Sequence, residues 1–129
     1  MPTLEDALKW LKGLGMDVPS DIVNAWLEIA LDLESCFTAN GYAPSVQKLI
    51  VLHLLALYGL SAGNRYISSQ SAPSGASRSF RYADLANAWR GQMGMLKLLD
   101  KNGCANGLIP SPPVRKNIGI GIAIGDCRH

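Results

Sequence analysis

The architecture of this chain depends on one run of residues, Leu49-Ile50-Val51-Leu52-His53-Leu54-Leu55-Ala56-Leu57-Tyr58-Gly59-Leu60. Pro44-Ser45 precedes the run, and proline is tolerated in the first turn of a helix. Apolar side chains cover every side of the predicted helix, which is typical of a buried helix. The run is too short for the roughly 20 residues that span a bilayer. We therefore expect a central helix around which the others pack.

Two helices are predicted before this central one. The first begins at Thr3 and ends at Gly13 to Gly15. The second begins at Pro19-Ser20 and ends at Asn40-Gly41, where glycine accepts the left-handed conformation. Its apolar residues recur with a period of 3.6 and predict one inward stripe: Ile22, Trp26, Ile29, Ala30, Leu33 and Phe37.

A fourth helix is predicted from about Asp84 to Asn102-Gly103. The residues expected to face inward are Leu85, Trp89, Gln92 or Met93, Leu96 and Leu99. Those expected to face outward are Asn87, Arg90, Lys97 and Lys101.

Two segments depart from this helical pattern. Residues 64–83 include a serine-rich stretch with the turn residues Pro73-Ser74-Gly75, which predicts a projecting β-hairpin or long loop. Residues 104–129 contain three prolines and then Ile alternating with Gly or Ala, which predicts an extended C-terminal arm with a strand. The predicted fold is mainly α: a four-helix bundle-like body at 3–103 that carries the hairpin or loop, followed by the arm.

Charge is divided unevenly along the 129 residues. From Met1 to Gly63 there are three Lys and seven Asp or Glu, a balance of −4; from Asn64 to His129 there are nine Lys or Arg and three Asp, a balance of +6. Two halves of opposite net charge favour head-to-tail contact between copies, or contact of a basic face with nucleic acid. The alternative is that this uneven division of charge has no functional consequence.

The cysteines are Cys36, Cys104 and Cys127. Their odd number, with no CxxC spacing and no histidine at metal-ligand spacing, predicts reduced thiols in a cytosolic chain. The acidic, amphipathic N-terminus does not resemble a signal peptide.

The sequence offers few parts for catalysis. His53 lies within the most apolar helix and is predicted to be a core histidine bonded to a nearby polar group, while His129 is the last residue. No nucleophile elbow, zinc-protease or phosphate-loop motif is present. We expect no enzyme activity, no catalytic residue, no metal and no cofactor.

Candidate assembly residues lie in the two atypical segments. They are Arg65, Tyr66, Arg78, Phe80 and Arg81 near the predicted hairpin, and Ile118, Ile120, Ile122 and Ile124 in the arm. Basic and aromatic residues together can contact nucleic-acid backbones without sequence specificity, although aromatic side chains packing onto the body are the alternative. The alternating strand could pair with the hairpin or with a neighbouring molecule.

Four segments in this order resemble the head–tail connector (adaptor) proteins of tailed bacteriophages. They are Asp17-Val18-Pro19-Ser20-Asp21-Ile22-Val23, Leu52-His53-Leu54-Leu55-Ala56-Leu57, the serine-rich Ser68 to Phe80, and a helix running to Leu98-Leu99. The resemblance covers Thr3 to Gly103, and the Ile-Gly repeat departs from it.

This resemblance implies a structural virion subunit of the neck, assembled in the host cytoplasm. Such helical subunits form a ring, typically of twelve copies, under the portal protein. The ring extends the DNA channel through which DNA ejection occurs and provides the platform for tail or nozzle proteins. Implied partners are the portal, neighbouring copies and, through non-specific contact, packaged DNA, with no membrane. The alternatives are a head-closure or tail-completion protein, and a small DNA-binding regulator.

Overall fold

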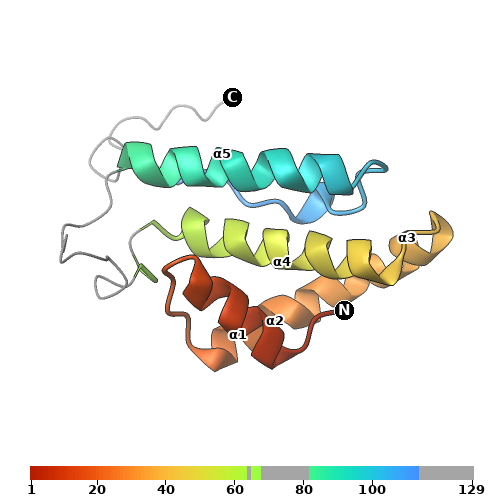
Figure 1. Cartoon of the computed structure of the whole chain (residues 1–129), viewed down its shortest axis with the longest axis horizontal. Coiled ribbons are helices and arrows are strands. Elements are labelled where there is room, and N and C mark those ends of the chain that lie inside the picture. The colour runs from red at the N-terminus through yellow and green to blue at the C-terminus, as the bar shows by residue number, and fades with distance from the viewer. Residues whose placement is uncertain (64, 68–81, 114–129) are drawn as a thin grey trace.

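Helix α4 (Pro44–Ser61) runs through the middle of the molecule, with α5 (Tyr82–Leu99) on one side and α1 (Leu4–Gly13) and α2 (Ser20–Ala30) on the other (Figure 1). Ten of its residues are buried, from Ile50 to Leu57 and at Gly59 and Leu60. This confirms the predicted central helix. Among the described helices, α4 is the one whose length and apolar composition would suffice to cross a membrane, yet most of it is buried against the rest of the protein, as in a core helix.

The computed structural model describes residues 1–63, 65–67 and 82–113. Within these ranges the chain is mainly α, as predicted, and contains no named strand. One isolated antiparallel bridge joins Met16 to Ile67.

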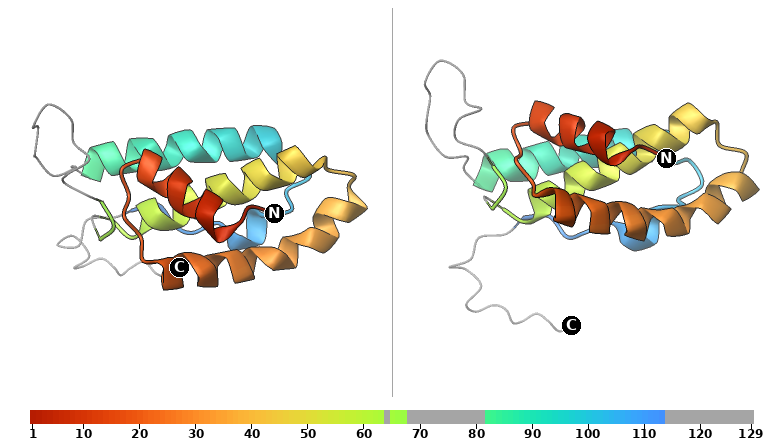
Figure 2. Two further views of the ribbon diagram at one scale, coloured as in Figure 1. Left: turned by 60° about the horizontal axis from the view of Figure 1, so that its bottom comes forward. Right: turned by 90° about the horizontal axis from the view of Figure 1, so that it is seen from below.

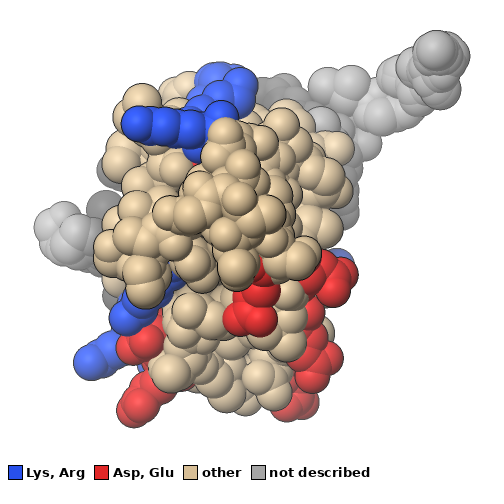
Figure 3. Space-filling model, turned by 90° about the vertical axis from the view of Figure 1, so that its right-hand side faces the viewer, with Lys and Arg blue, Asp and Glu red and all other residues tan. Residues whose placement is uncertain are grey.

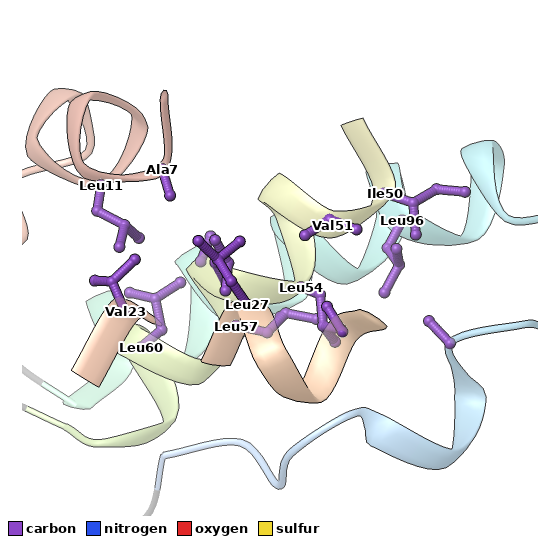
Figure 4. Close-up of a cluster of buried hydrophobic side chains, with 14 of the residues drawn as sticks. Ala7, Leu11, Val23, Leu27, Ile50, Val51, Leu54, Leu57, Leu60 and Leu96 are labelled. Atoms are coloured by element: carbon purple, nitrogen blue, oxygen red, sulfur yellow. The ribbon is translucent and has the colours of Figure 1, made fainter. Parts of the chain in front are cut away.

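Side chains from four helices form one core (Figure 4). The labelled residues come from α1, α2, α4 and α5: Ala7, Leu11, Val23, Leu27, Ile50, Val51, Leu54, Leu57, Leu60 and Leu96. Burying a large aliphatic side chain contributes about 1.5–3 kcal/mol. The contacts of α4 with all three neighbouring helices therefore hold the body together.

The first helix has a capping box at its start. Thr3 Oγ1 accepts from the backbone N–H of Asp6, and the Asp6 carboxylate accepts from the backbone N–H of Thr3. These bonds satisfy two backbone donors that a helix start leaves free. Thr3 therefore begins the helix, as predicted.

The second predicted helix is divided in the structure. Helix α2 ends at Ala30, a 3-10 turn covers Leu31–Leu33, and α3 (Glu34–Ala39) completes the path. Within α2 the buried stripe follows Val23, Leu27 and Ala30, and the 3-10 turn, with three residues per turn, shifts it further beyond Ala30. Val23, Leu27, Ala30, Leu33 and Phe37 are buried, whereas Ile29 is exposed, so its predicted inward position is wrong. The stop at Asn40-Gly41 is confirmed, with Gly41 at φ 70°.

Helix α5 carries the predicted faces. Leu85 and Leu96 are buried, and Trp89, Met93 and Leu99 pack against the core. The four residues expected to face outward are all exposed: Asn87, Arg90, Lys97 and Lys101.

Residues 104–113 lie against the body rather than in a free arm. Ala105 is fully buried, a 3-10 helix covers Asn106–Leu108, and Leu108 and Ile109 pack on the core. The hydroxyl of Ser61 at the end of α4 donates to the carbonyl oxygen of Ser111. The extended path predicted from 104 is therefore absent at 104–108, which form a turn and a 3-10 helix. The rest of the predicted arm, 114–129, lies outside the described residues.

Candidate assembly surfaces

Two of the predicted assembly residues, Arg65 and Tyr66, lie in the described part of the chain. Arg65 is exposed. The ring of Tyr66 meets Trp26 edge-on at 5.9 Å, and Trp26 also contacts Tyr58 at 5.5 Å. The carbonyl oxygen of Tyr66 accepts from the backbone N–H of Asp17 at 2.7 Å. Tyr66 thus fixes the chain to the body, whereas Arg65 is left at the surface.

The other predicted assembly residues fall outside the described ranges: Arg78, Phe80, Arg81, Ile118, Ile120, Ile122 and Ile124. The structure does describe the residues that border the two segments containing them. Ile67 follows α4, Tyr82 begins α5, and Pro113 follows the segment bonded to the end of α4. Figure 2 shows the end of α4 and the start of α5 at the same end of the body, and the bond between Ser61 and Ser111 holds the chain just before Pro113 there as well. Segments 68–81 and 114–129 therefore leave the body from one end.

The opposite end is closed by covalent and hydrogen bonds. Cys36 of α3 and Cys104 form a disulfide with their Cα atoms 5.8 Å apart, across a sequence separation of 68. Asn40 Nδ2 donates to the carbonyl oxygen of Cys36 at 2.9 Å and lies beside both sulfurs. The prediction of reduced thiols is wrong for this pair, because packing of α3 beside the turn after α5 brings the two cysteines together. Cys127 lies outside the described residues.

Asp100 organises the turn at the same end. Its carboxylate accepts from the hydroxyl of Tyr42 and from the backbone N–H groups of Cys104 and Ala105. Burial and the bond to Asp100 raise the pKa of the Tyr42 phenol. These groups hold the chain against the body just after α5 ends.

His53 is a structural residue, as predicted. It is buried, its Nδ1 lies 2.8 Å from the carbonyl oxygen of Leu49, and its ring packs on Trp10 at 5.2 Å. A carbonyl oxygen can only accept, so Nδ1 carries the proton in this bond. Within the described ranges, no group of three or more His, Cys, Asp or Glu side chains could hold a metal ion.

The described surface separates acidic from basic side chains. Between Lys12 and Lys48 the chain has no Lys or Arg, and α2, the 3-10 turn and α3 carry Asp21, Glu28, Asp32 and Glu34. Beyond Leu85, the exposed charged side chains of the described residues are Arg90, Lys97 and Lys101. Figure 3 shows basic side chains at the top of one end of the molecule, mainly acidic ones along its lower right edge, and basic and acidic ones together at its lower left.

Exposed apolar side chains accompany both charged regions, and sequence patterns missed this. Ile29 and Leu31 lie beside the acids, Leu98 follows Lys97, and Met95 is exposed on another side of α5. The sequence did contain a sign of this exposure in α5, because Leu98 directly follows Lys97, which was predicted to face outward. It was hidden for Ile29, because the buried side of α2 follows Val23, Leu27 and Ala30 and leaves Ile29 outside it, and for Leu31, which begins the 3-10 turn.

Comparison with known proteins gives a family. Neither a curated protein nor a solved structure matches the chain. One family model, described as a family of unknown function (DUF7370), matches residues 1–126 and so nearly the whole sequence. The chain therefore belongs to DUF7370, a family of unknown function.

Proposed function

We propose that this protein is a non-enzymatic head–tail connector subunit of a tailed bacteriophage. In this role, copies form a ring beneath the portal that extends the DNA channel and offers a platform for tail proteins. The proposal includes a hairpin or loop at 68–81 and an extended strand after Pro113, both reaching neighbouring molecules. The resemblance of four ordered sequence segments to connector proteins is its starting point.

The observation that carries the proposal is the common departure point of the two segments. Ile67, Tyr82 and Pro113 gather at one end of a rigid helical body (Figure 2). A ring subunit needs flanks that meet its neighbours and an end that meets a different protein. The helical body offers charged flanks, and the described residues that border 68–81 and 114–129 lie at one of its ends.

A DNA-binding regulator fits the structure less well. A helix-turn-helix protein places its second helix in the major groove, where side chains reach base edges. The corresponding helix here is α4, which is buried along most of its length between α5 and α1. Basic side chains lie on α5 instead, where they can contact phosphates without reading sequence.

Mixing the purified chain with the portal protein encoded in the same genome tests the proposal. We expect a ring-shaped complex by electron microscopy and co-migration with the portal in size-exclusion chromatography. A second sample should lack residues 118–129. It should unfold at the same temperature as the full chain but join the portal less efficiently. A full-length chain that stays monomeric beside the portal would contradict the connector role.

A further inference from the structure

Three exposed acidic residues follow one line along α2 and the turn after it. Asp21, Glu28 and Asp32, here called the acidic stripe, are separated by seven and four residues. Such spacing returns to the same side of a helix after two turns and then one. Asp32 lies in the 3-10 turn, two residues beyond the end of α2.

Three exposed basic residues follow a matching line along α5. Arg90, Lys97 and Lys101, here called the basic stripe, are also separated by seven and four residues. Lys101 lies two residues beyond the end of α5, as Asp32 does beyond α2. At a rise of about 1.5 Å per residue, the gaps in both stripes are about 10 Å and 6 Å.

The two helices run in the same direction. Figures 1 and 2 show α2 and α5 on opposite sides of α4, each leading from the end where Pro113 lies towards the end that holds the disulfide. A second copy moved sideways would therefore bring its α2 alongside α5 of the first, parallel to it. In both stripes a gap of seven residues comes first and a gap of four follows. The charges of the two stripes can therefore pair one to one only if the two helices are parallel, as they are in this placement.

Apolar side chains are exposed beside both stripes. Ile29 and Leu31 are 43% and 48% exposed, and Leu98, the residue after Lys97, is 68% exposed. An interface usually has apolar residues at its centre and charged residues at its rim. The one ion pair among the described residues joins Lys48 to Asp6, so no residue of either stripe forms an ion pair within the described part of its own chain. Arg90 donates a 2.6 Å hydrogen bond to Oδ1 of the neutral Asn87, which leaves its charge uncompensated.

We propose that copies of this chain associate head to tail, with the acidic stripe of one copy against the basic stripe of the next. The pairs are Asp21 with Arg90, Glu28 with Lys97, and Asp32 with Lys101. Ile29 and Leu31 of the first copy then lie near Leu98 of the second. Such a contact uses two different surfaces, so it continues from copy to copy and closes into a ring when the rotation permits. This inference deepens the proposed function by naming the surfaces through which its copies meet.

Charge reversal at the central pair tests the inference. Glu28→Lys and Lys97→Glu each place like charges together in every contact, so each should weaken self-association at least about tenfold. The double variant E28K/K97E restores opposite charges and should recover association. A mixture of the two single variants should also associate, because E28K and K97E molecules that alternate in the assembly place opposite charges together in every contact. Glu5→Lys and Lys9→Glu on α1 change the net charge equally and serve as matched controls that should behave as the original chain.

Sedimentation velocity at low salt over a wide range of concentration is the measurement. Association should also weaken as the ionic strength approaches about 1 M, where the Debye length falls to about 3 Å. A chain that is monomeric at every concentration would overturn the inference, as would single variants that associate normally or a double variant as weak as its parents. Portal binding is scored separately, so a chain that joins the portal while E28K has no effect loses this interface but keeps its proposed function.

Discussion

The hydroxyl of Tyr42 donates a 2.7 Å hydrogen bond to Oδ1 of Asp100, residues 58 positions apart in the sequence. The same hydroxyl accepts from the backbone N–H of Asn102 at 2.8 Å. Asp100 lies at the end of α5, where the helix dipole disfavours a negative charge. Donors from Tyr42 and from the backbone of Cys104 and Ala105 offset that cost. The pair therefore joins the start of α4 to the chain that follows α5.

Replacing Asp100 by alanine should destabilise the protein by about 2–4 kcal/mol, because two backbone N–H groups and a phenol lose their acceptor in a buried place. Urea unfolding followed by circular dichroism measures this change. Asp17→Ala is the matched control: Asp17 is exposed, so its removal should change stability by less than about 0.5 kcal/mol. Equal losses in the two variants would contradict the bonding role of Asp100.

Removing the disulfide should also lower stability. The Cys36–Cys104 link encloses a separation of 68 residues, for which the chain-entropy model gives about 4 kcal/mol, with about 2–4 typical in practice. C36S/C104S should therefore unfold at lower urea concentration. A non-reducing digest should contain the two joined peptides, and their absence from the chain purified from oxidising buffer would contradict the link.

Glycine at position 59 leaves room for a buried methionine. A Cβ at this position would lie 2.5 Å from Sδ of Met16, which is 1% exposed and has little freedom to move. Gly59→Ala should thus destabilise the protein by about 1–3 kcal/mol through overpacking, despite the better helix propensity of alanine. Gly91→Ala on α5 meets nothing within 4 Å and should stabilise by about 0.5–1 kcal/mol. The midpoint of urea unfolding measures both changes in stability. Midpoints that shift in the same direction for the two variants would contradict this packing.

Tyr66→Ala should loosen the chain after α4. Contact with Trp26 holds the tyrosine in place, and its carbonyl oxygen in turn accepts from Asp17. Loss of about 1.4 kcal/mol of anchoring corresponds to tenfold faster hydrogen exchange of the Asp17 amide. Arg65→Ala removes a neighbouring exposed side chain and should leave that exchange rate unchanged. An unaltered rate in Tyr66→Ala would show that the backbone alone holds the segment.

Alkaline pH should weaken the fold through two tyrosines. Burial raises the pKa of Tyr58, and burial together with Asp100 raises the pKa of Tyr42, above the ordinary value of 10.0. A raised pKa in the folded state means that the stabilisation is complete below pH 10.0 and is lost as the pH rises through the folded pKa. Urea midpoints across this range should fall less steeply for Tyr58→Phe than for the original chain. Identical slopes would contradict a contribution from Tyr58.

Sequence patterns predicted the features that depend on local chemistry. The apolar run around His53 identified the central helix, since no helix face was left for water, and the alternation on α5 separated Leu96 from Lys97. Three-dimensional features were missed. Cys36 and Cys104 become neighbours only through packing of α3 against the turn after α5. The prolines near Pro113 predicted an extended path but held no information on the surface that this path follows.

The connector resemblance and the charge division of the sequence suggested contacts between copies, but not the surfaces involved. The acidic and basic stripes can be matched only once it is known that α2 and α5 run in the same direction, and this is known from the fold and not from the sequence. The candidate residues in 68–81 and 114–129 stay predictions, because they lie outside the described residues.

Anchoring of the chain up to Pro113 sets a limit on what its end can touch. The 16 residues from Val114 to His129 can span at most about 55 Å when fully stretched. Any partner that the isoleucines at 118, 120, 122 and 124 contact must therefore lie within that radius of Pro113. For the nearest of them, Ile118, the tether is only five residues, or about 17 Å. In the proposed ring, a molecule that Ile118 contacts must therefore lie directly beside this subunit.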